Sequence, residues 1–175
     1  MNIKAENLSL QFDKYFALKD VNFEIEGNKI FGLLGRNGAG KTTLLSLIAS
    51  FREPTSGKLT INGVAPFENA DIMQQVAFLY DQDYENEYHN VIDYLKGIAP
   101  YRPNFSMEYA EQLIDLFKLD RKKQLKKFSK GMKSAVNVII GLASRAPITL
   151  LDEIYLGMDA HLREIFYKEL LEEQA

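Results

Sequence analysis

The sequence predicts an α/β layered domain, and the order of its elements carries that prediction. Alternating apolar residues at the N-terminus predict antiparallel strands, and a strand, a glycine-rich turn and a helix follow over residues 30–49. Helical periodicity then extends over residues 91–127, and strand character returns at residues 148–151. We therefore expect an antiparallel β-subdomain, an α/β core and an inserted helical subdomain.

The N-terminal part of the chain predicts a meander of strands. Polar and apolar residues alternate over residues 3–12 and again over residues 17–25, as they do in half-buried strands. A turn is expected at Glu26-Gly27-Asn28. Residues 58–61 predict a further short strand, and the Asn62-Gly63 dipeptide after it is typical of a tight hairpin turn.

The second half of the chain predicts helices placed between two core strands. Residues 75–80 predict a buried strand, and the apolar positions of residues 91–127 recur at helical spacing. Pro100 and Pro103 should divide this helical run. Residues 160–173 predict an amphipathic helix at the end of the chain.

Composition and charge exclude several classes of protein. The 175 residues carry a formal net charge of −3, so no overall positive field favours nucleic acid. Cysteine is absent, which excludes disulfides and thiolate metal sites and fits a reducing cytosol. The N-terminus lacks the apolar core of a signal peptide, and the longest apolar stretches are too short to cross a bilayer. We expect a protein that is itself soluble.

The segment that begins near residue 30 carries the most specific chemical pattern. Gly35, Gly40, Lys41 and Thr42 complete the pattern G-x-x-x-x-G-K-[ST] between a predicted buried strand at residues 30–34 and a helix. Glycines let backbone N–H groups approach a phosphate chain, and the start of the helix adds positive potential. Lys41 should reach the β- and γ-phosphates, and the Thr42 hydroxyl should hold Mg²⁺. The alternative is a glycine turn that carries Lys and Thr by chance.

Two carboxylates follow the apolar residues 148–151. Asp152 and Glu153 would lie at the carboxyl end of a core strand, where ligands bind in open α/β sheets. Phosphoryl transfer to water needs one acid near Mg²⁺ and another that orients or deprotonates the attacking water, and these two residues suit those roles. For an isolated Asp-Glu pair, a polar strand end without a function is the alternative.

A second anion site is predicted just before a helical run over residues 133–145. Ser129 is a candidate N-cap and Gly131 would leave the backbone accessible, although an ordinary helix cap explains both residues equally well. Basic residues gather nearby and favour a solvated face, with guidance of ATP or contact with anionic lipid headgroups as the functional alternatives. They are Arg121, Lys122, Lys123, Lys126, Lys127, Lys130 and Lys133.

Four motifs, in the same order, resemble those of the nucleotide-binding domain of ABC-type ATPases. Residues 35–42 resemble the Walker A loop, and residues 148–153 resemble the Walker B strand with its terminal glutamate. Residues 128–132 resemble the signature motif L-S-G-G-Q, and residues 157–159 resemble the D-loop. The resemblance extends from about Ile3 to the C-terminus.

The resemblance implies one ABC-type ATPase domain over residues 1–175. Its P-loop NTPase core, with the N-terminal antiparallel β-subdomain, would occupy about residues 1–80 and 146–175. The inserted helical subdomain, with the signature motif, would occupy about residues 85–145. In this family two such domains pair head to tail, and ATP with Mg²⁺ lies between the Walker A loop of one and the signature motif of the other.

The resemblance also implies roles for individual residues. Phe12 stands where the family has an aromatic residue that stacks on adenine, with Tyr15 as a second candidate. The implied catalytic residues are Glu153, Lys41, Asp81 and Gln82, and the implied metal contacts are Thr42, Asp152 and Asp81. The implied nucleotide-binding residues are Phe12, Gly35, Arg36, Asn37, Gly38, Ala39, Gly40, Lys41, Thr42, Thr43, Ser129, Lys130, Gly131 and Asp159.

Several positions depart from the family pattern. Asp81, with Gln82 next to it, stands at the Q-loop position, which normally offers Gln or Glu, and this shorter carboxylate would reach the metal only through water. Lys130 and Met132 replace a glycine and the glutamine of the signature motif, and Lys130 adds a cation that could favour phosphate. Ile154 replaces the proline that usually follows the catalytic glutamate.

The switch histidine of the family would lie well beyond the D-loop, whereas this chain stops at Ala175. His161 is too near Asp159 to take that role and, like His89, is expected to be an exposed residue. The resemblance therefore implies a domain that lacks its C-terminal switch-histidine region, apparently by truncation, and that puts turnover in doubt.

The leading hypothesis is an ATP-binding and hydrolysing subunit of an ABC membrane transporter. Residues 76–95 most resemble bacterial exporter-type members. The implied partners are a second ABC ATPase domain, in a homo- or heterodimer, and an integral membrane permease that would hold this cytoplasmic chain at the inner face of the cell membrane. No nucleic acid is expected. The alternatives are a non-transport ABC ATPase and a truncated nucleotide-binding module without turnover.

Overall fold

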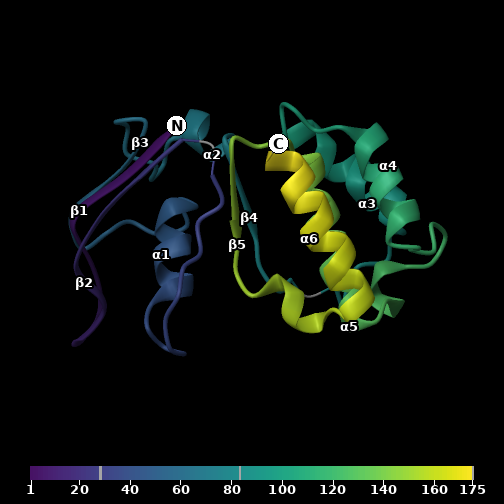
Figure 1. Cartoon of the computed structure of the whole chain (residues 1–175), viewed down its shortest axis with the longest axis horizontal. Coiled ribbons are helices and arrows are strands. Elements are labelled where there is room, and N and C mark those ends of the chain that lie inside the picture. The colour runs from purple at the N-terminus through teal and green to yellow at the C-terminus, as the bar shows by residue number, and fades with distance from the viewer. Residues whose placement is uncertain (28, 83, 175) are drawn as a thin grey trace. The chain divides into compact units, whose positions relative to one another are not determined.

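A computed structural model describes residues 1–27, 29–82 and 84–174 of the chain. The chain divides into two compact units, Met1–Val76 and Ala77–Ala175. Figure 1 shows the elements of each unit along the colour ramp. Of the turn predicted at residues 26–28, Asn28 lies outside the described residues.

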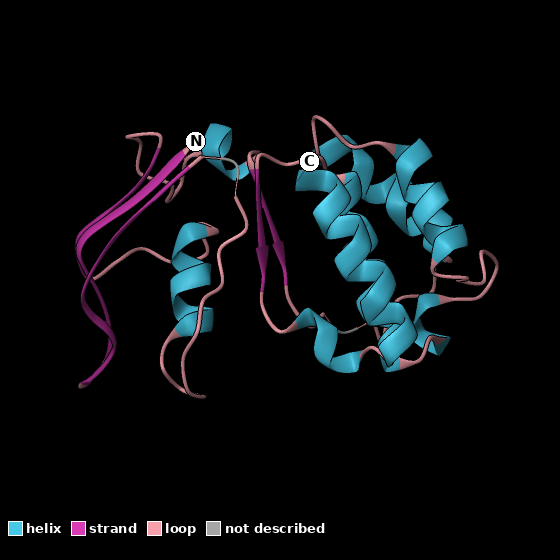
Figure 2. Cartoon of the chain, viewed as in Figure 1, coloured by secondary structure: helices cyan, strands magenta, loops and turns pink. Residues whose placement is uncertain are grey.

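The first unit contains a three-stranded antiparallel sheet, as the alternation of apolar residues predicted. Its strands are β1 (Asn2–Phe12), β2 (Tyr15–Glu26) and β3 (Ser56–Ile61), in the order β2-β1-β3. Figure 2 shows them as the long strands of the chain. The turn after β3 has the hairpin geometry expected of Asn-Gly, because Asn62 has φ 51° and Gly63 has φ 83°.

One helix of the first unit, α1 (Lys41–Ile48), packs its apolar residues against this sheet. Leu44, Leu47 and Ile48 are buried, and α1 contacts β2. A single short turn, α2 (Ala70–Met73), begins at Asn69, whose side chain accepts a hydrogen bond from the Ile72 N–H. The packing of α1 against the sheet therefore fixes the position of the start of α1, where the phosphate loop ends, relative to β2.

The strand predicted before the phosphate loop is absent, and that prediction is wrong. The described residues 30–34 form neither helix nor strand. Their side chains are exposed, from 44% at Leu33 to 93% at Leu34. A strand exists only where a neighbouring strand satisfies its backbone groups, and none of the described strands β1, β2 and β3 pairs with this segment. The apolar run alone could not show this.

The second unit contains a two-stranded sheet covered by helices. Its strands are β4 (Val76–Leu79), whose first residue ends the first unit, and β5 (Ile148–Leu151), and they pair with each other. The longest of the central helices is α5 (Lys130–Ala143), and α6 (Ala160–Gln174) packs against it. Both strands and the closing helix lie where the sequence predicted them, and α5 begins three residues earlier than expected.

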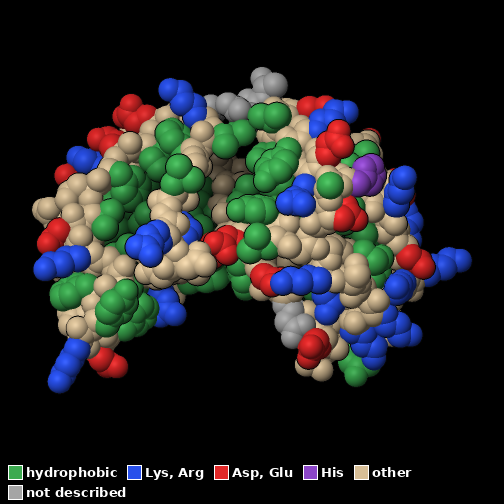
Figure 3. Space-filling model, turned by 60° about the horizontal axis from the view of Figure 1, so that its bottom comes forward, with side chains coloured by type: hydrophobic (Ala, Val, Ile, Leu, Met, Phe, Trp, Pro, Cys, Tyr) green, Lys and Arg blue, Asp and Glu red, His purple; other side chains and the backbone are tan. Residues whose placement is uncertain are grey.

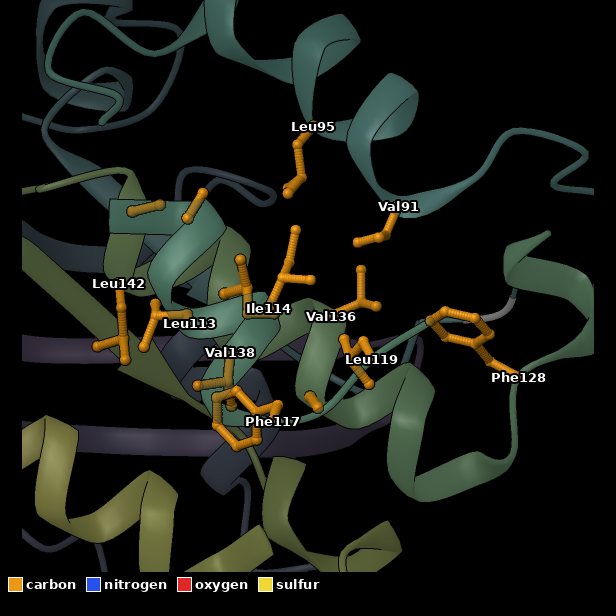
Figure 4. Close-up of a cluster of buried hydrophobic side chains, with 14 of the residues drawn as sticks. Val91, Leu95, Leu113, Ile114, Phe117, Leu119, Phe128, Val136, Val138 and Leu142 are labelled. Carbon is orange, nitrogen blue, oxygen red and sulfur yellow. The ribbon is translucent and has the colours of Figure 1, made fainter. Parts of the chain in front are cut away.

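The helices predicted over residues 91–127 form the core of the second unit with α5. They are α3 (Val91–Ile98) and α4 (Met107–Leu116), with the short 3-10 turn η1 (Ala99–Tyr101) between them. A second 3-10 turn, η2 (Leu125–Lys127), lies between α4 and α5. The break between α3 and α4 falls at the predicted prolines. Figure 4 shows the side chains that these helices contribute to one apolar cluster, among them Val91, Leu95, Leu113, Ile114, Phe117, Val136 and Val138.

Within the described part of the chain, no helix combines the length and the apolar character that a membrane span requires.

Candidate nucleotide site

The glycine-rich loop of residues 35–42 leads into α1 by way of a glycine that no other residue could replace without strain. Gly40 has φ +87°, a left-handed conformation that favours glycine. A Cβ atom at this position would lie 2.5 Å from the Ala17 carbonyl oxygen and 2.8 Å from the Leu18 side chain. The glycine therefore lets the loop close onto β2 at the point where α1 begins.

The start of α1 has the properties of an anion site. No side chain caps this helix, and the first turn has no acidic residue, so the positive end of the helix dipole is not neutralised locally. Lys41 Nζ donates hydrogen bonds to the loop's own carbonyl oxygens at Gly35, 3.0 Å away, and at Arg36, 3.2 Å away. Its ammonium group therefore lies over the loop. These residues fit a phosphate chain.

Thr42 and Thr43 stand in the first turn of α1, beside Lys41. Arg36, Asn37, Gly38 and Ala39 form the turn that precedes it, and Gly38 has φ +80°. When a nucleotide with Mg²⁺ is bound, this turn and the Thr42 hydroxyl would hold it, and the metal would supply charge neutralisation. The described residues include no cluster of three His, Asp or Glu side chains that could hold a metal without such a ligand.

The proposed base-stacking residue lies in the same unit as the loop. Phe12 is the last residue of β1, is 41% exposed and carries the Arg52 guanidinium 5.1 Å from its ring centroid. Tyr15, the second candidate, opens β2 and is 62% exposed. Phe12 pairs with Tyr15 across the hairpin, so both aromatic residues lie at the same end of the sheet.

The carboxylates predicted for catalysis lie in the second unit, at the ends of its paired strands. The Asp152 N–H donates to the Leu79 carbonyl oxygen at 2.9 Å, so the carboxyl ends of β4 and β5 meet. Asp81 and Gln82 come one residue after the end of β4, and the Gln82 amide lies 3.4 Å from the Tyr94 hydroxyl. Glu153 has φ +52°, an uncommon conformation for a residue with a side chain. Such outliers concentrate at functional sites.

The signature-like segment begins α5, and Ser129 is its N-cap, as predicted. The Ser129 hydroxyl accepts a hydrogen bond from the Met132 N–H at 3.3 Å. Gly131 allows a close contact, because a Cβ atom there would lie 2.8 Å from the Gly157 carbonyl oxygen. Asp159, two residues further on, accepts from the Leu162 N–H at 2.9 Å and so caps α6. The structure thus brings the signature-like and D-loop-like segments together.

Two positions that depart from the family pattern contact each other. Lys130 Nζ lies 3.5 Å from an Asp81 carboxylate oxygen, and both side chains are largely exposed. An exposed pair of this kind contributes at most about 1 kcal/mol and can open readily. The residue pair therefore connects the end of β4 with the start of α5 without fixing either of them.

Sequence reasoning missed a buried polar contact behind this pair. The Tyr84 hydroxyl donates to the Asn137 side-chain oxygen, and the Asn137 amide donates to the Tyr80 carbonyl oxygen at 3.2 Å. Tyr84 is 2% exposed, and burial raises the pKa of its phenol well above the ordinary value of 10.0. The one available signal was a lone asparagine within the apolar face of a helix. Asn137 thereby holds the segment that carries Asp81 against α5.

The residues named for one nucleotide site are divided between the two units. Phe12 and residues 35–43 belong to Met1–Val76, whereas Asp81, Gln82 and all later candidates belong to Ala77–Ala175. Within the first unit the structure brings the loop and Phe12 to one sheet. Within the second it brings together the ends of β4 and β5, the start of α5 and the D-loop-like segment. The two histidines, His89 and His161, are exposed, as expected.

The comparisons with known proteins indicate one class of protein, the ATP-binding domains that carry a phosphate loop. The family model for ABC transporters matches residues 18–155. YtrB of Bacillus subtilis (strain 168), an ABC transporter ATP-binding protein, is 33% identical over 99% of this chain and 59% of its own length. CysA of Synechocystis sp., a sulfate/thiosulfate import ATP-binding protein, is 33% identical over 94% of this chain and 48% of its own length.

Solved structures show the same fold. An ATP-binding subunit of an ABC transporter matches with a TM-score of 0.86 at 25% identity, over 99% of this chain and 75% of that one. A putative ABC transporter ATP-binding protein from Pyrococcus furiosus matches with a TM-score of 0.83 at 27% identity, over 99% and 86%. The α/β P-loop fold with an N-terminal antiparallel sheet is therefore confirmed.

This chain belongs to the ABC transporter family of ATP-binding proteins. It spans about half to three fifths of the length of the two relatives described above.

Proposed function

We propose that this chain is the ATP-binding and hydrolysing subunit of a bacterial ABC exporter. The observation that carries the proposal is the phosphate loop, which Gly40 closes onto β2 at the uncapped start of α1, with the Lys41 ammonium above it. Membership of the ABC transporter family supports ATP and Mg²⁺ as the ligands.

The proposed site is composite. ATP would contact Phe12 and residues 35–43 of one domain and Ser129, Lys130, Gly131 and Asp159 of a second domain, in a head-to-tail homo- or heterodimer. The contact between the signature-like and D-loop-like segments supports this arrangement, because it presents both on one unit. So does the fold of the dimeric cassette MJ0796 bound to ADP and phosphate, which matches with a TM-score of 0.80 at 21% identity.

Glu153 orients and deprotonates the attacking water, and Lys41 neutralises charge on the phosphates. Thr42, Asp152 and Asp81 would hold Mg²⁺, and the ion would neutralise charge on the phosphates. Gln82, next to Asp81, acts with it at the Q-loop position. The family's Gln or Glu at that position supports a role there in sensing the γ-phosphate.

The test of these roles is Glu153→Gln. Removal of a general base should lower ATP turnover by about 10²- to 10⁴-fold and leave the affinity for Mg²⁺-ATP unchanged. Glu164→Gln is the matched control, because Glu164 is an exposed carboxylate on α6, and it should leave turnover unaltered. Turnover in Glu153→Gln equal to that of the parent chain would remove the assignment.

Attachment to a permease and the direction of transport need a separate experiment. Relatives named for import and for bacitracin transport both match this chain, so the export assignment rests on residues 76–95. When the affinity-tagged chain is isolated from its native cells, an integral membrane protein should co-purify with it. That protein would hold the chain at the inner face of the cell membrane. Recovery with ribosomes instead would favour a non-transport ABC ATPase. Reconstituted vesicles would then show in which direction the substrate moves.

A further inference from the structure

An arginine covers the exposed aromatic ring at the end of β1. The Arg52 guanidinium carbon lies 5.1 Å from the centroid of the Phe12 ring. Arg52 is exposed and Phe12 is 41% exposed, so the contact faces solvent. A cation over an aromatic ring at such a site contributes about 0.5–1 kcal/mol, which is little enough for another flat group to open it.

The backbone that carries Arg52 is fixed to the same sheet. The Thr55 N–H donates to the Ser9 carbonyl oxygen at 2.9 Å, and the Gln11 N–H donates to the Thr55 hydroxyl at 3.0 Å. On the other side of Arg52, the Ser50 hydroxyl donates to the Pro66 carbonyl oxygen at 2.6 Å. The side chain can therefore move, while its point of attachment stays beside Phe12.

The covered ring lies close to the phosphate loop. Gly40 approaches β2 at Ala17 and Leu18, and Leu18 pairs with Leu10 of β1. Phe12 follows Leu10 by two residues, which is about 7 Å along a strand. The ribose and phosphate chain of a nucleotide can bridge this span. All of these residues belong to the first unit.

We propose that Arg52 forms the second face of a purine site, so that the base lies between the Phe12 ring and the Arg52 guanidinium. This inference rests on the proposed function. A guanidinium is planar and stacks on aromatic faces, as does a phenyl ring. Stacking on two faces favours the larger purine over a pyrimidine and does not read the edge of the base. The site should therefore accept ATP and GTP alike and bind CTP and UTP more weakly.

The experiment compares Mg²⁺-ATP with inorganic tripolyphosphate, which has the phosphates but no base. Arg52→Ala should weaken ATP binding by about 3- to 30-fold, the range for a partly desolvated cation over a ring, and leave tripolyphosphate binding unchanged. Arg52→Lys keeps the positive charge but lacks the planar face. It should therefore weaken ATP binding less than Arg52→Ala does, but still weaken it relative to the parent chain. Lys19→Ala is the matched control, because Lys19 Nζ lies 5.6 Å from the Phe16 ring in the same unit.

The outcomes separate this inference from the proposed function. Equal losses for ATP and tripolyphosphate in Arg52→Ala would show that Arg52 acts only as a charge and would overturn the stacking role. Unchanged ATP binding in Arg52→Ala would overturn it too, and the proposed function would stand if Lys41→Ala weakened the binding of both ligands. A parent chain that binds neither ligand would overturn the proposed function and the purine site together.

Discussion

At the scale of single residues, the phosphate loop depends on one glycine and one lysine. Gly40 is required twice, for its left-handed φ and for the close approach to Ala17. The pattern of residues 35–42 was enough to predict the loop, because each position has a direct chemical reason. It could not predict that Lys41 contacts the loop's own carbonyl oxygens, since these are contacts of the folded chain.

Replacement of this glycine should therefore be more damaging than replacement of an ordinary left-handed glycine. Gly27→Ala should cost only the roughly 1–2 kcal/mol of a left-handed residue, because Gly27 has φ +84° and open space around it. Gly40→Ala should cost roughly 1–3 kcal/mol more, since its methyl group meets backbone. Urea unfolding of both variants measures the difference. Equal losses would contradict the close approach to β2.

The hydroxyl group of buried Tyr84 should also contribute to stability, because it donates a hydrogen bond to Asn137. Tyr84→Phe would leave the buried Asn137 oxygen without its donor, and the free energy of unfolding should fall by roughly 1–3 kcal/mol. Tyr109→Phe is the control, because the Tyr109 hydroxyl donates to Glu169 at a partly exposed site, and it should cost less. A smaller loss for Tyr84→Phe than for Tyr109→Phe would argue against the buried contact.

The Tyr84 phenol should also make the free energy of unfolding fall at alkaline pH. Burial raises the pKa of Tyr84 above 10.0, so the folded chain keeps the proton that the unfolded chain releases. Stability from this group is complete below about pH 10 and is lost as the pH rises further. Unfolding measured from pH 8 to pH 11 should show a steeper alkaline decline in the parent chain than in Tyr84→Phe.

At the scale of elements, hydrophobic periodicity and capping residues predicted most helices and strands. Ser129 was identified as an N-cap, and α4 and α5 both begin after a serine whose hydroxyl accepts from the third residue on. The failure at residues 30–34 has a physical cause: an apolar run does not supply the neighbouring strand that a sheet requires. The contact between Asn137 and Tyr84 was equally invisible, because it joins segments far apart in the sequence.

The two serine caps allow a comparison between stability and function. Ser129→Ala and Ser106→Ala should each lower the free energy of unfolding by about 1 kcal/mol, because each removes one N-cap hydrogen bond. Only Ser129→Ala should also weaken Mg²⁺-ATP-dependent association of two chains, which sedimentation velocity measures. Similar losses of association in both variants would assign Ser129 a structural role alone.

At the scale of the whole molecule, the order of four motifs carried more information than any one of them. It predicted the family and the P-loop fold, which the comparisons confirm. It did not predict that the chain divides after Val76, because a division depends on the number of contacts across it and not on motifs. The basic residues of the second unit gather on its surface, as Figure 3 shows, and their role in guiding ATP stays a prediction.

The most direct measurement of the central claim is calorimetry of Mg²⁺-ATP binding to the 175-residue chain, its Lys41→Ala variant and a Lys58→Ala control. A charged hydrogen bond contributes about 1.5–3 kcal/mol, so Lys41→Ala should weaken binding by roughly 10- to 100-fold. Lys58 is an exposed lysine of the same unit, and its replacement should leave binding unaltered. Binding that is equally strong in all three proteins, or absent from the parent chain, would contradict a nucleotide site at the phosphate loop.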